Sequence, residues 1–123
     1  MTPDERRAKN AAWMRAYYAK RKAVDPAWVA SERARKRTSQ LANAAWLNEI
    51  KLVAGCADCG YREHAVALDF DHRPGEAKRF NVAWAKMRSK AVLLAEIAKC
   101  DVVCSNCHRV RTHARQLATS LTS

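Results

Sequence analysis

Cys56-Ala57-Asp58-Cys59 and Cys104-Ser105-Asn106-Cys107 are two Cys-x-x-Cys pairs, and they decide the fold. Together they offer four thiolates, the tetrahedral ligand set of a structural Zn²⁺ with bonds of about 2.3 Å. A redox site needs only one such pair in a thioredoxin-like context, which this sequence lacks. Residues 60–103 lie between the pairs, so the spacing predicts a subdomain inserted between two zinc knuckles. We expect Cys100 to be a small buried hydrophobic residue.

The composition favours a polyanionic partner, because 23 Lys and Arg outnumber 12 Asp and Glu and give the 123 residues a net charge of +11. Nucleic acid or an anionic membrane face fits this excess. The apolar runs are shorter than the roughly 18 residues that a membrane span needs, and residues 1–7 hold no apolar signal segment. We therefore expect a cytoplasmic protein that crosses no membrane. In a reducing compartment, Cys-x-x-Cys pairs are more often metal ligands than disulfides.

Residues 1–40 carry 11 basic and 4 acidic side chains and contain an imperfect duplication, with residues 12–22 resembling residues 27–37. Each copy begins Ala-Trp and ends with three basic residues. Because Asp25-Pro26 separates the copies, the pattern predicts two basic helices, about 4–23 and 26–37, and leaves open whether the second continues. A solvated helical face is the plainer interpretation, but interleaved aromatic residues favour a DNA-binding arm that contacts phosphates without reading sequence. Its predicted contacts are Arg15, Lys20, Arg21, Lys22, Arg35, Lys36 and Arg37.

The rest of the chain predicts an α+β domain over residues 41–117, followed by a disordered tail at 118–123. An amphipathic helix is expected over 38–54, anchored by Trp46, and alternation of apolar residues predicts a strand over 66–72. A turn at 73–75 leads to a short returning strand at 80–82. Further helices are expected at 91–98 and from the second knuckle to Leu117. The expected order is strand, turn, short strand, insertion and helix, with zinc fastening the outer ends.

The residue types needed for phosphodiester hydrolysis occur at two places in this domain. Asp71-His72 ends the predicted strand, and His108 directly follows the second cysteine pair. An imidazole can take a proton from water at neutral pH. A divalent cation held by a carboxylate and an imidazole can relieve charge on the phosphate and on the departing oxygen.

These segments resemble the HNH nucleases, whose fold is the ββα-metal finger, and especially the small HNH proteins of bacteriophage genomes. The resemblance covers about residues 47–113 and excludes the basic arm. The matching segments are Cys56 to Gly60, Leu68 to His72, Glu96 to Cys100 and Cys104 to Arg109. It implies a bacterial or phage-infected host cell, double-stranded DNA as partner, and other phage proteins as further possible partners. The oligomeric state is left open.

The resemblance implies a role for each matching residue. His72 corresponds to the general base, whereas Asp71 and His108 correspond to ligands of a catalytic cation such as Mg²⁺ or Mn²⁺, distinct from the structural Zn²⁺. In many relatives the middle asparagine of the motif lies where this chain has Lys99, so Asn106 or Asn81 would take its place, and we favour Asn106. The predicted phosphate contacts of this domain are Arg73, Arg109, Arg111 and Arg115.

A rival interpretation is a catalytically inactive zinc-knuckle protein that binds DNA. Such a protein would need the basic arm and the four cysteines but not Asp71, His72 or His108. A redox or metal-storage protein would leave the charge unexplained.

Overall fold

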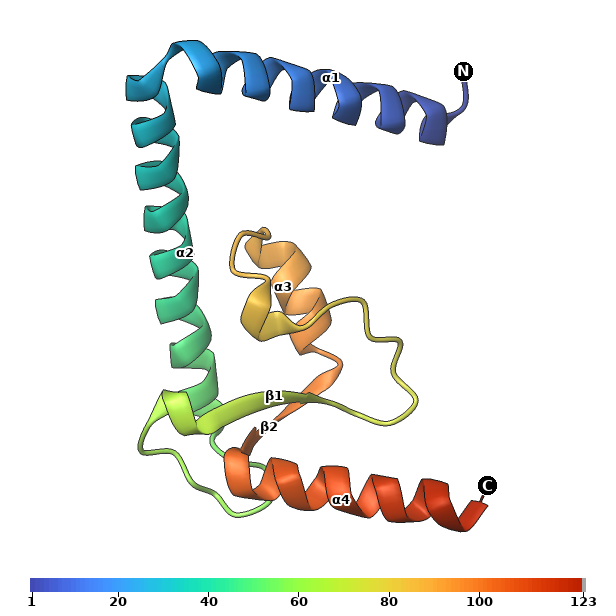
Figure 1. Cartoon of the computed structure of the whole chain (residues 1–123). Helices are drawn as coiled ribbons and strands as arrows, with labels where there is room; N and C mark the ends of the chain where they lie inside the picture. Colours follow the sequence, from blue (N-terminus) through green and yellow to red (C-terminus); the bar gives the residue numbers. More distant parts are fainter. Residues whose placement is uncertain (123) are drawn as a thin grey trace. The chain divides into compact units, whose positions relative to one another are not determined.

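The structure is a computed structural model that describes residues 1–122, and its elements follow one another as labelled in Figure 1. The elements are α1 (Pro3–Val24), α2 (Pro26–Ala54), β1 (Leu68–His72), α3 (Lys90–Ile97), β2 (Cys100–Cys104) and α4 (Ser105–Thr122), with 3₁₀ turns at Ala65–Ala67 and Val82–Trp84. Helices combined with one two-stranded sheet confirm the predicted α+β class. The chain divides into two compact units, Met1–Thr38 and Ser39–Ser123. Among residues 1–122, no helix is both long and apolar enough to cross a membrane.

Local capping explains the two helices of the first unit. Thr2 and Glu5 form a reciprocal capping box at the start of α1, in which the Thr2 hydroxyl accepts from the Glu5 N–H and the Glu5 carboxylate accepts from the Thr2 N–H. Asp25 ends α1, and its side chain accepts a hydrogen bond from the Trp28 N–H at 3.0 Å in the first turn of α2. Pro26 then occupies the first position of α2, where its missing N–H costs nothing. The predicted break at Asp25-Pro26 is confirmed.

An aromatic chain holds the two helices of this unit together. Trp13 stacks on Tyr17 with ring centroids 5.4 Å apart, Tyr17 meets Tyr18 edge-on, and Tyr18 stacks on Trp28 at 5.4 Å. The Arg21 guanidinium lies 4.9 Å from the Trp28 ring centroid. Because no residue of α1 is buried, these ring contacts replace a conventional core.

Helix α2 is longer than either segment that the sequence predicts for this region. It runs without interruption from Pro26 to Ala54, joining the predicted helices 26–37 and 38–54. No proline or glycine falls between residues 27 and 54, so nothing in the backbone forces a break. Gly55 ends the helix with φ +68°, a left-handed conformation that favours glycine, and its N–H donates to the Lys51 carbonyl at 2.8 Å.

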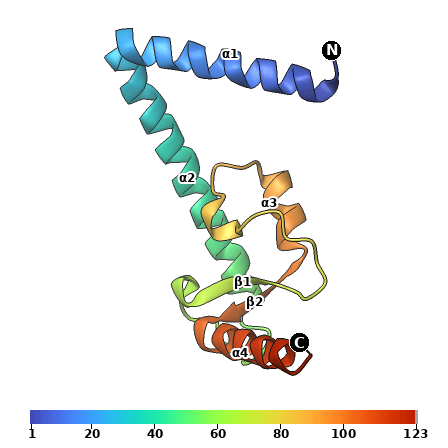
Figure 2. The ribbon, with the colours of Figure 1, turned by 45° about the vertical axis from the view of Figure 1, so that its right-hand side comes forward.

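The sheet of the second unit pairs β1 with β2 in antiparallel register, from Leu68 opposite Cys104 to His72 opposite Cys100. Both ribbon views show the two strands side by side (Figures 1 and 2). The predicted returning strand at 80–82 is wrong, because Val82 begins a 3₁₀ turn that Asn81 caps through its side chain. The partner of β1 is instead the segment that carries Cys104 and leads directly into α4. Strand pairing and the second knuckle are therefore coupled.

Two small apolar clusters form the core of the second unit. One consists of Cys56, Leu68, Val102, Val103 and Cys104. The other consists of Leu47, Val82 and Leu93, with Trp46 packed against it as expected, and Phe70 contacts both clusters. Cores of this size supply little stability by themselves, so we expect the second unit to need a further source of stability.

Helix α4 extends beyond the predicted end of the domain at Leu117. It continues to Thr122, so the predicted disordered tail is helical over residues 118–122, and Ser123 lies outside the described residues. The Thr119 hydroxyl donates to the Arg115 carbonyl at 3.0 Å, which suits a threonine inside a helix. Ala118 and Leu121 are good helix formers, which favours continuation of the helix over fraying.

Candidate metal centre and catalytic pocket

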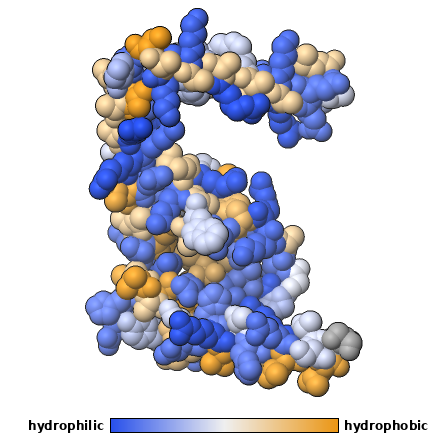
Figure 3. All heavy atoms as spheres, viewed as in Figure 1, coloured by the Kyte–Doolittle hydropathy of each residue, from blue (hydrophilic) through white to orange (hydrophobic). Residues whose placement is uncertain are grey.

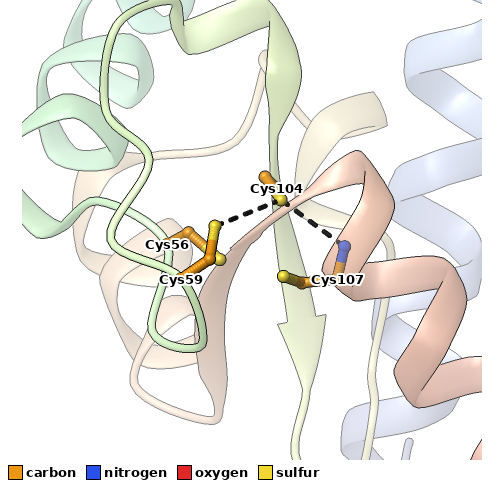
Figure 4. Close-up of side chains that lie close together, drawn as sticks. All are labelled: Cys56, Cys59, Cys104 and Cys107. Carbon is orange, nitrogen blue, oxygen red and sulfur yellow. Dashed lines mark hydrogen bonds between the residues drawn. The ribbon is translucent and has the colours of Figure 1, made fainter.

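The four predicted zinc ligands converge on one point. All four sulfurs of Cys56, Cys59, Cys104 and Cys107 lie within 4.8 Å of one another and point toward a common centre (Figure 4). Cys59 Sγ and Cys104 Sγ are 3.7 Å apart. A tetrahedral ion with bonds of about 2.3 Å places its sulfurs ~3.8 Å apart, so the cluster fits a metal such as zinc. All four cysteines are free thiols.

The electrostatics of the cluster favour thiolate at one position. Burial raises the pKa of the Cys56 thiol, but hydrogen bonds from backbone N–H groups outweigh this and lower the pKa to about 6. A hydrogen bond with Cys104 raises the pKa of Cys107. Because a metal binds thiolate, cation binding must displace the remaining protons.

A second group of polar side chains lies on β1 and the first turn of α4. His108 Nδ1 is 3.0 Å from Asp69 Oδ2, and His108 Nε2 is 3.6 Å from Asp71 Oδ1. Asp69 and Asp71 share a strand face because they are two residues apart. The chain thus brings together Asp71 and His108, the two residues predicted to hold a catalytic cation.

Asp71 is a buried carboxylate, 5% exposed, that contacts two arginines of α4. Arg115 donates to both of its oxygens, at 2.8 and 2.9 Å, and Arg111 donates to one at 3.2 Å. Burial raises the pKa of Asp71, but these hydrogen bonds outweigh it and hold the pKa below its ordinary value. Asp71 is therefore an anion, as a cation ligand must be, although Arg115 would have to yield to the metal.

His72 lies next in the strand and faces a different partner. Its Nε2 is 3.1 Å from Oε2 of Glu96, a residue of α3 that is only 1% exposed. His72, Asp71 and His108 nevertheless line one pocket of about 410 Å³. Lys51 and Lys78 also line this pocket, and burial lowers the pKa of Lys51. A pocket that combines these cations with carboxylates and imidazoles can accept an anion beside a metal ion.

Oxygen and imidazole donors suit a hard divalent cation, but they are few. Within residues 1–122, the four cysteines are the only group of three or more His, Cys, Asp or Glu residues close enough to hold a metal. Asp71 and His108 therefore offer two ligands, and water or phosphate would have to complete the shell.

Several residues predicted to act at the site lie elsewhere. Asn106 is exposed in the first turn of α4 and is not among the residues that line the pocket, and Asn81, the alternative, does line it. Arg73 donates to the carbonyls of Ala98 and Cys100, so it ties the end of β1 to the start of β2.

The guanidinium of Arg111 is occupied by carboxylates of the protein. It donates to both oxygens of Asp58 at 2.6 and 2.7 Å, to Asp101 at 2.9 Å and to Asp71. These hydrogen bonds raise its pKa further, so Arg111 links the first knuckle, both strands and α4. Arg109 is exposed on α4 and shares a shallow hollow with His108 and His113.

The predicted contacts of the basic arm are mostly accessible. Arg21 is half-buried over Trp28, whereas the others are exposed: Arg15, Lys20, Lys22, Arg35, Lys36 and Arg37. Hydrophilic side chains project from α1 and from the first part of α2 in Figure 3. The interleaved aromatic residues of the arm contact one another.

Glu96 is a site residue to which the sequence alone gave no role. One signal was available for Glu96, since a single carboxylate within the apolar run Leu93-Leu94-Ala95-Glu96-Ile97 has to be exposed or paired. Arg115 was predicted as a phosphate contact, and because basic residues are frequent along the whole chain, nothing in the sequence indicated that it would pair with Asp71.

We compared the chain with known proteins. No protein-family model, no curated protein and no solved structure matches it.

The lowered carboxylate pKa values predict that the second unit loses stability in acid. A hydrogen bond from Lys99 lowers the pKa of the Glu96 carboxyl most, against the effect of burial, from 4.5 to about 2. Because the folded-state pKa lies below the unfolded one, the ionised group stabilises the fold above about pH 4.5, and this contribution is lost as the pH falls toward 2. Denaturant unfolding of the zinc-loaded protein should show a steeper decline below about pH 5 for wild type than for Glu96→Gln. Release of zinc in acid affects both proteins alike. If the free energy of unfolding falls with pH equally in wild type and Glu96→Gln, ionised Glu96 does not stabilise the fold.

Proposed function

We propose that this chain is a metal-dependent endonuclease that hydrolyses DNA phosphodiester bonds, an HNH-type enzyme with a zinc-stapled fold. The observation that carries the proposal is the approach of His108 Nε2 to Asp71 Oδ1, 3.6 Å, in a pocket that His72 also lines. Carboxylate, imidazole and a second imidazole are the groups that metal-assisted phosphodiester hydrolysis requires.

In this proposal Asp71 and His108 hold a divalent cation such as Mg²⁺ or Mn²⁺, which supplies charge relief at the phosphate and the departing oxygen. His72 takes a proton from the attacking water as its oxygen bonds to phosphorus. The bond between phosphorus and the 3′ oxygen then breaks, and that oxygen gains a proton. The products are a 3′-hydroxyl and a 5′-phosphate, as the HNH resemblance implies. Lys51 and Lys78 add positive charge beside the phosphate.

A direct test is to incubate the zinc-loaded protein with supercoiled plasmid across a panel of divalent cations. The proposal predicts nicked or linear product with at least one hard cation and no product when that cation is omitted. A panel without any cutting, under conditions in which the protein still binds DNA, would contradict it.

The alternative is a catalytically inactive zinc protein that binds DNA. One observation favours it, because both oxygens of Asp71 are hydrogen-bonded to Arg115 and a cation would have to displace that guanidinium. Under this alternative Arg115 and Asp71 form a permanent ion pair that joins β1 to α4. The cation panel separates the two functions, since only the enzyme cuts.

The basic arm gives a prediction for DNA affinity that holds under either function. Neutralising Lys20, Lys22 and Lys36 together by alanine should weaken binding and lower the salt slope of log Kd by roughly 3, about 0.9 for each phosphate that is no longer neutralised. Fluorescence anisotropy with a labelled duplex at several salt concentrations measures this slope. The matched control replaces the same lysines by arginine, which keeps the charge and should leave the slope unchanged. Equal slopes for the alanine variant and wild type would exclude a role for these lysines in DNA binding.

A further inference from the structure

Glu96 is one of two buried charged residues in the part of the chain that the structure describes, the other being Asp71. A carboxylate that is 1% exposed has to be hydrogen-bonded, because leaving it unpaired out of water would cost several kcal/mol. The helix that carries Glu96 is apolar after its first residue, Lys90, and Leu93 on the same helix is fully buried. The Glu96 carboxylate therefore depends on the few hydrogen-bond donors that reach it inside the protein.

Both oxygens of Glu96 have donors. Lys99 Nζ lies 2.8 Å from Oε1, whereas the Arg79 backbone N–H and His72 Nε2 lie 2.9 and 3.1 Å from Oε2. Lys99 also donates to the Ala77 carbonyl at 2.8 Å, so the lysine is fixed in place. A lysine and a backbone N–H beside it keep the carboxylate ionised, in agreement with its lowered pKa.

The ionised carboxylate determines which nitrogen of His72 carries a proton. A carboxylate without its proton only accepts hydrogen bonds, so His72 Nε2 must be the donor in this contact. A neutral imidazole carries one N–H, and its lone pair is therefore at Nδ1. The same ring lines the pocket shared with Asp71 and His108.

From these contacts we propose that Glu96 is the positioning residue of His72, holding it as the Nε2–H tautomer so that Nδ1 is the atom that accepts the proton from water. This inference rests on the proposed nuclease function for its catalytic half, whereas the tautomer is a property of the folded protein alone. Lys99 occupies the position where many HNH relatives have their middle asparagine. In this chain that position supports Glu96, and Glu96 in turn holds the base.

The tautomer can be measured directly by long-range ¹H–¹⁵N correlation spectra of the labelled, zinc-loaded full chain, recorded where the histidines are neutral. Comparison with His72→Ala assigns the signals of His72 among the four histidines. We expect a protonated Nε2 and an unprotonated Nδ1 in wild type. The opposite pattern, with the proton at Nδ1, would overturn the inference without the need for any further variant.

Two variants separate positioning from a structural role. Glu96→Gln should release the tautomer preference and lower the kcat for plasmid nicking by ~100-fold with KM for DNA unchanged, because the base is no longer aligned. Glu49→Gln makes the same change at an exposed carboxylate of α2 outside the pocket, so it should keep both the tautomer and kcat close to wild type.

The outcomes distinguish this inference from the proposed function. A Glu96→Gln protein that retains both tautomer and kcat overturns the inference, as does a Glu49→Gln protein that loses both equally. If wild type shows the expected tautomer but never cuts DNA, the nuclease function fails together with the catalytic role of Glu96, while the assignment of the proton to Nε2 is supported.

Discussion

Replacing His72 by alanine should abolish DNA cutting and leave DNA binding intact. General-base catalysis contributes roughly 10²–10⁴-fold to such reactions, so nicking of supercoiled plasmid should fall by about that factor. Binding should persist because most of the charges that we propose to contact phosphates lie elsewhere, above all on the basic arm. Gel quantification of nicked product and anisotropy with the same DNA give the two readouts.

The matched control for this prediction is His64→Ala. His64 is exposed, precedes the turn at Ala65–Ala67 and is not among the residues that line the pocket of His72. The His64→Ala variant should therefore nick supercoiled plasmid at the wild-type rate. If His72→Ala nicks plasmid as fast as His64→Ala, His72 is not the base, and a different group must activate the water.

The second large effect expected is the loss of the second unit when its metal is removed. Its two apolar clusters are small, and two of the buried members, Cys56 and Cys104, belong to the cysteine cluster itself. Metal binding at such sites contributes on the order of 10 kcal/mol to folding, more than the whole stability of many small domains. A strong chelator or Cys104→Ser should therefore abolish cooperative unfolding and collapse the dispersed amide spectrum of this unit.

Cys100→Ser provides the control for that experiment. Cys100 is half-buried at the start of β2, outside the cluster, and its thiol contacts the Glu96 carbonyl. Burial raises its pKa to about 11, as expected for a thiol that binds no metal. The variant should retain one bound zinc per chain and lose only about 1 kcal/mol. A chelated wild-type protein that still unfolds cooperatively would show that the core suffices without metal.

The features that the sequence predicted well depend on short-range pattern. The Cys-x-x-Cys spacings place two sulfurs at each knuckle, and alternation over residues 66–72 indicates β1. The resemblance of the segments around Asp71 and His108 to the HNH pattern implied that these two residues meet. In the structure His108 Nε2 lies 3.6 Å from Asp71 Oδ1.

The features that the sequence did not predict depend on long-range packing. The partner of β1 is Cys100–Cys104 instead of residues 80–82, where a 3₁₀ turn begins at Val82. The contacts of Arg111 with Asp58, and of Arg115 with Asp71, join residues more than forty positions apart in sequence. No periodicity encodes which of many arginines will meet a buried carboxylate.

The arrangement of Asp71 and Arg115 bears on how a cation could enter. At neutral pH Asp71 is already an anion, so no proton has to leave when metal binds. Metal binding would instead break the two hydrogen bonds that Arg115 donates to Asp71. The displaced guanidinium could then bind a DNA phosphate. DNA and metal would then bind cooperatively, since each supplies a partner that the other requires.

The most direct test of the account is the position of a catalytic cation. Crystals of the zinc-loaded protein with a short DNA duplex, grown in Mn²⁺, would locate that ion by its anomalous scattering. We predict a manganese peak between Asp71 Oδ1 and His108 Nε2, apart from the zinc at the four cysteines, with Arg115 withdrawn from Asp71. A complex in which only the cysteine site holds metal and Arg115 still contacts both oxygens of Asp71 would contradict the nuclease and favour the DNA-binding protein.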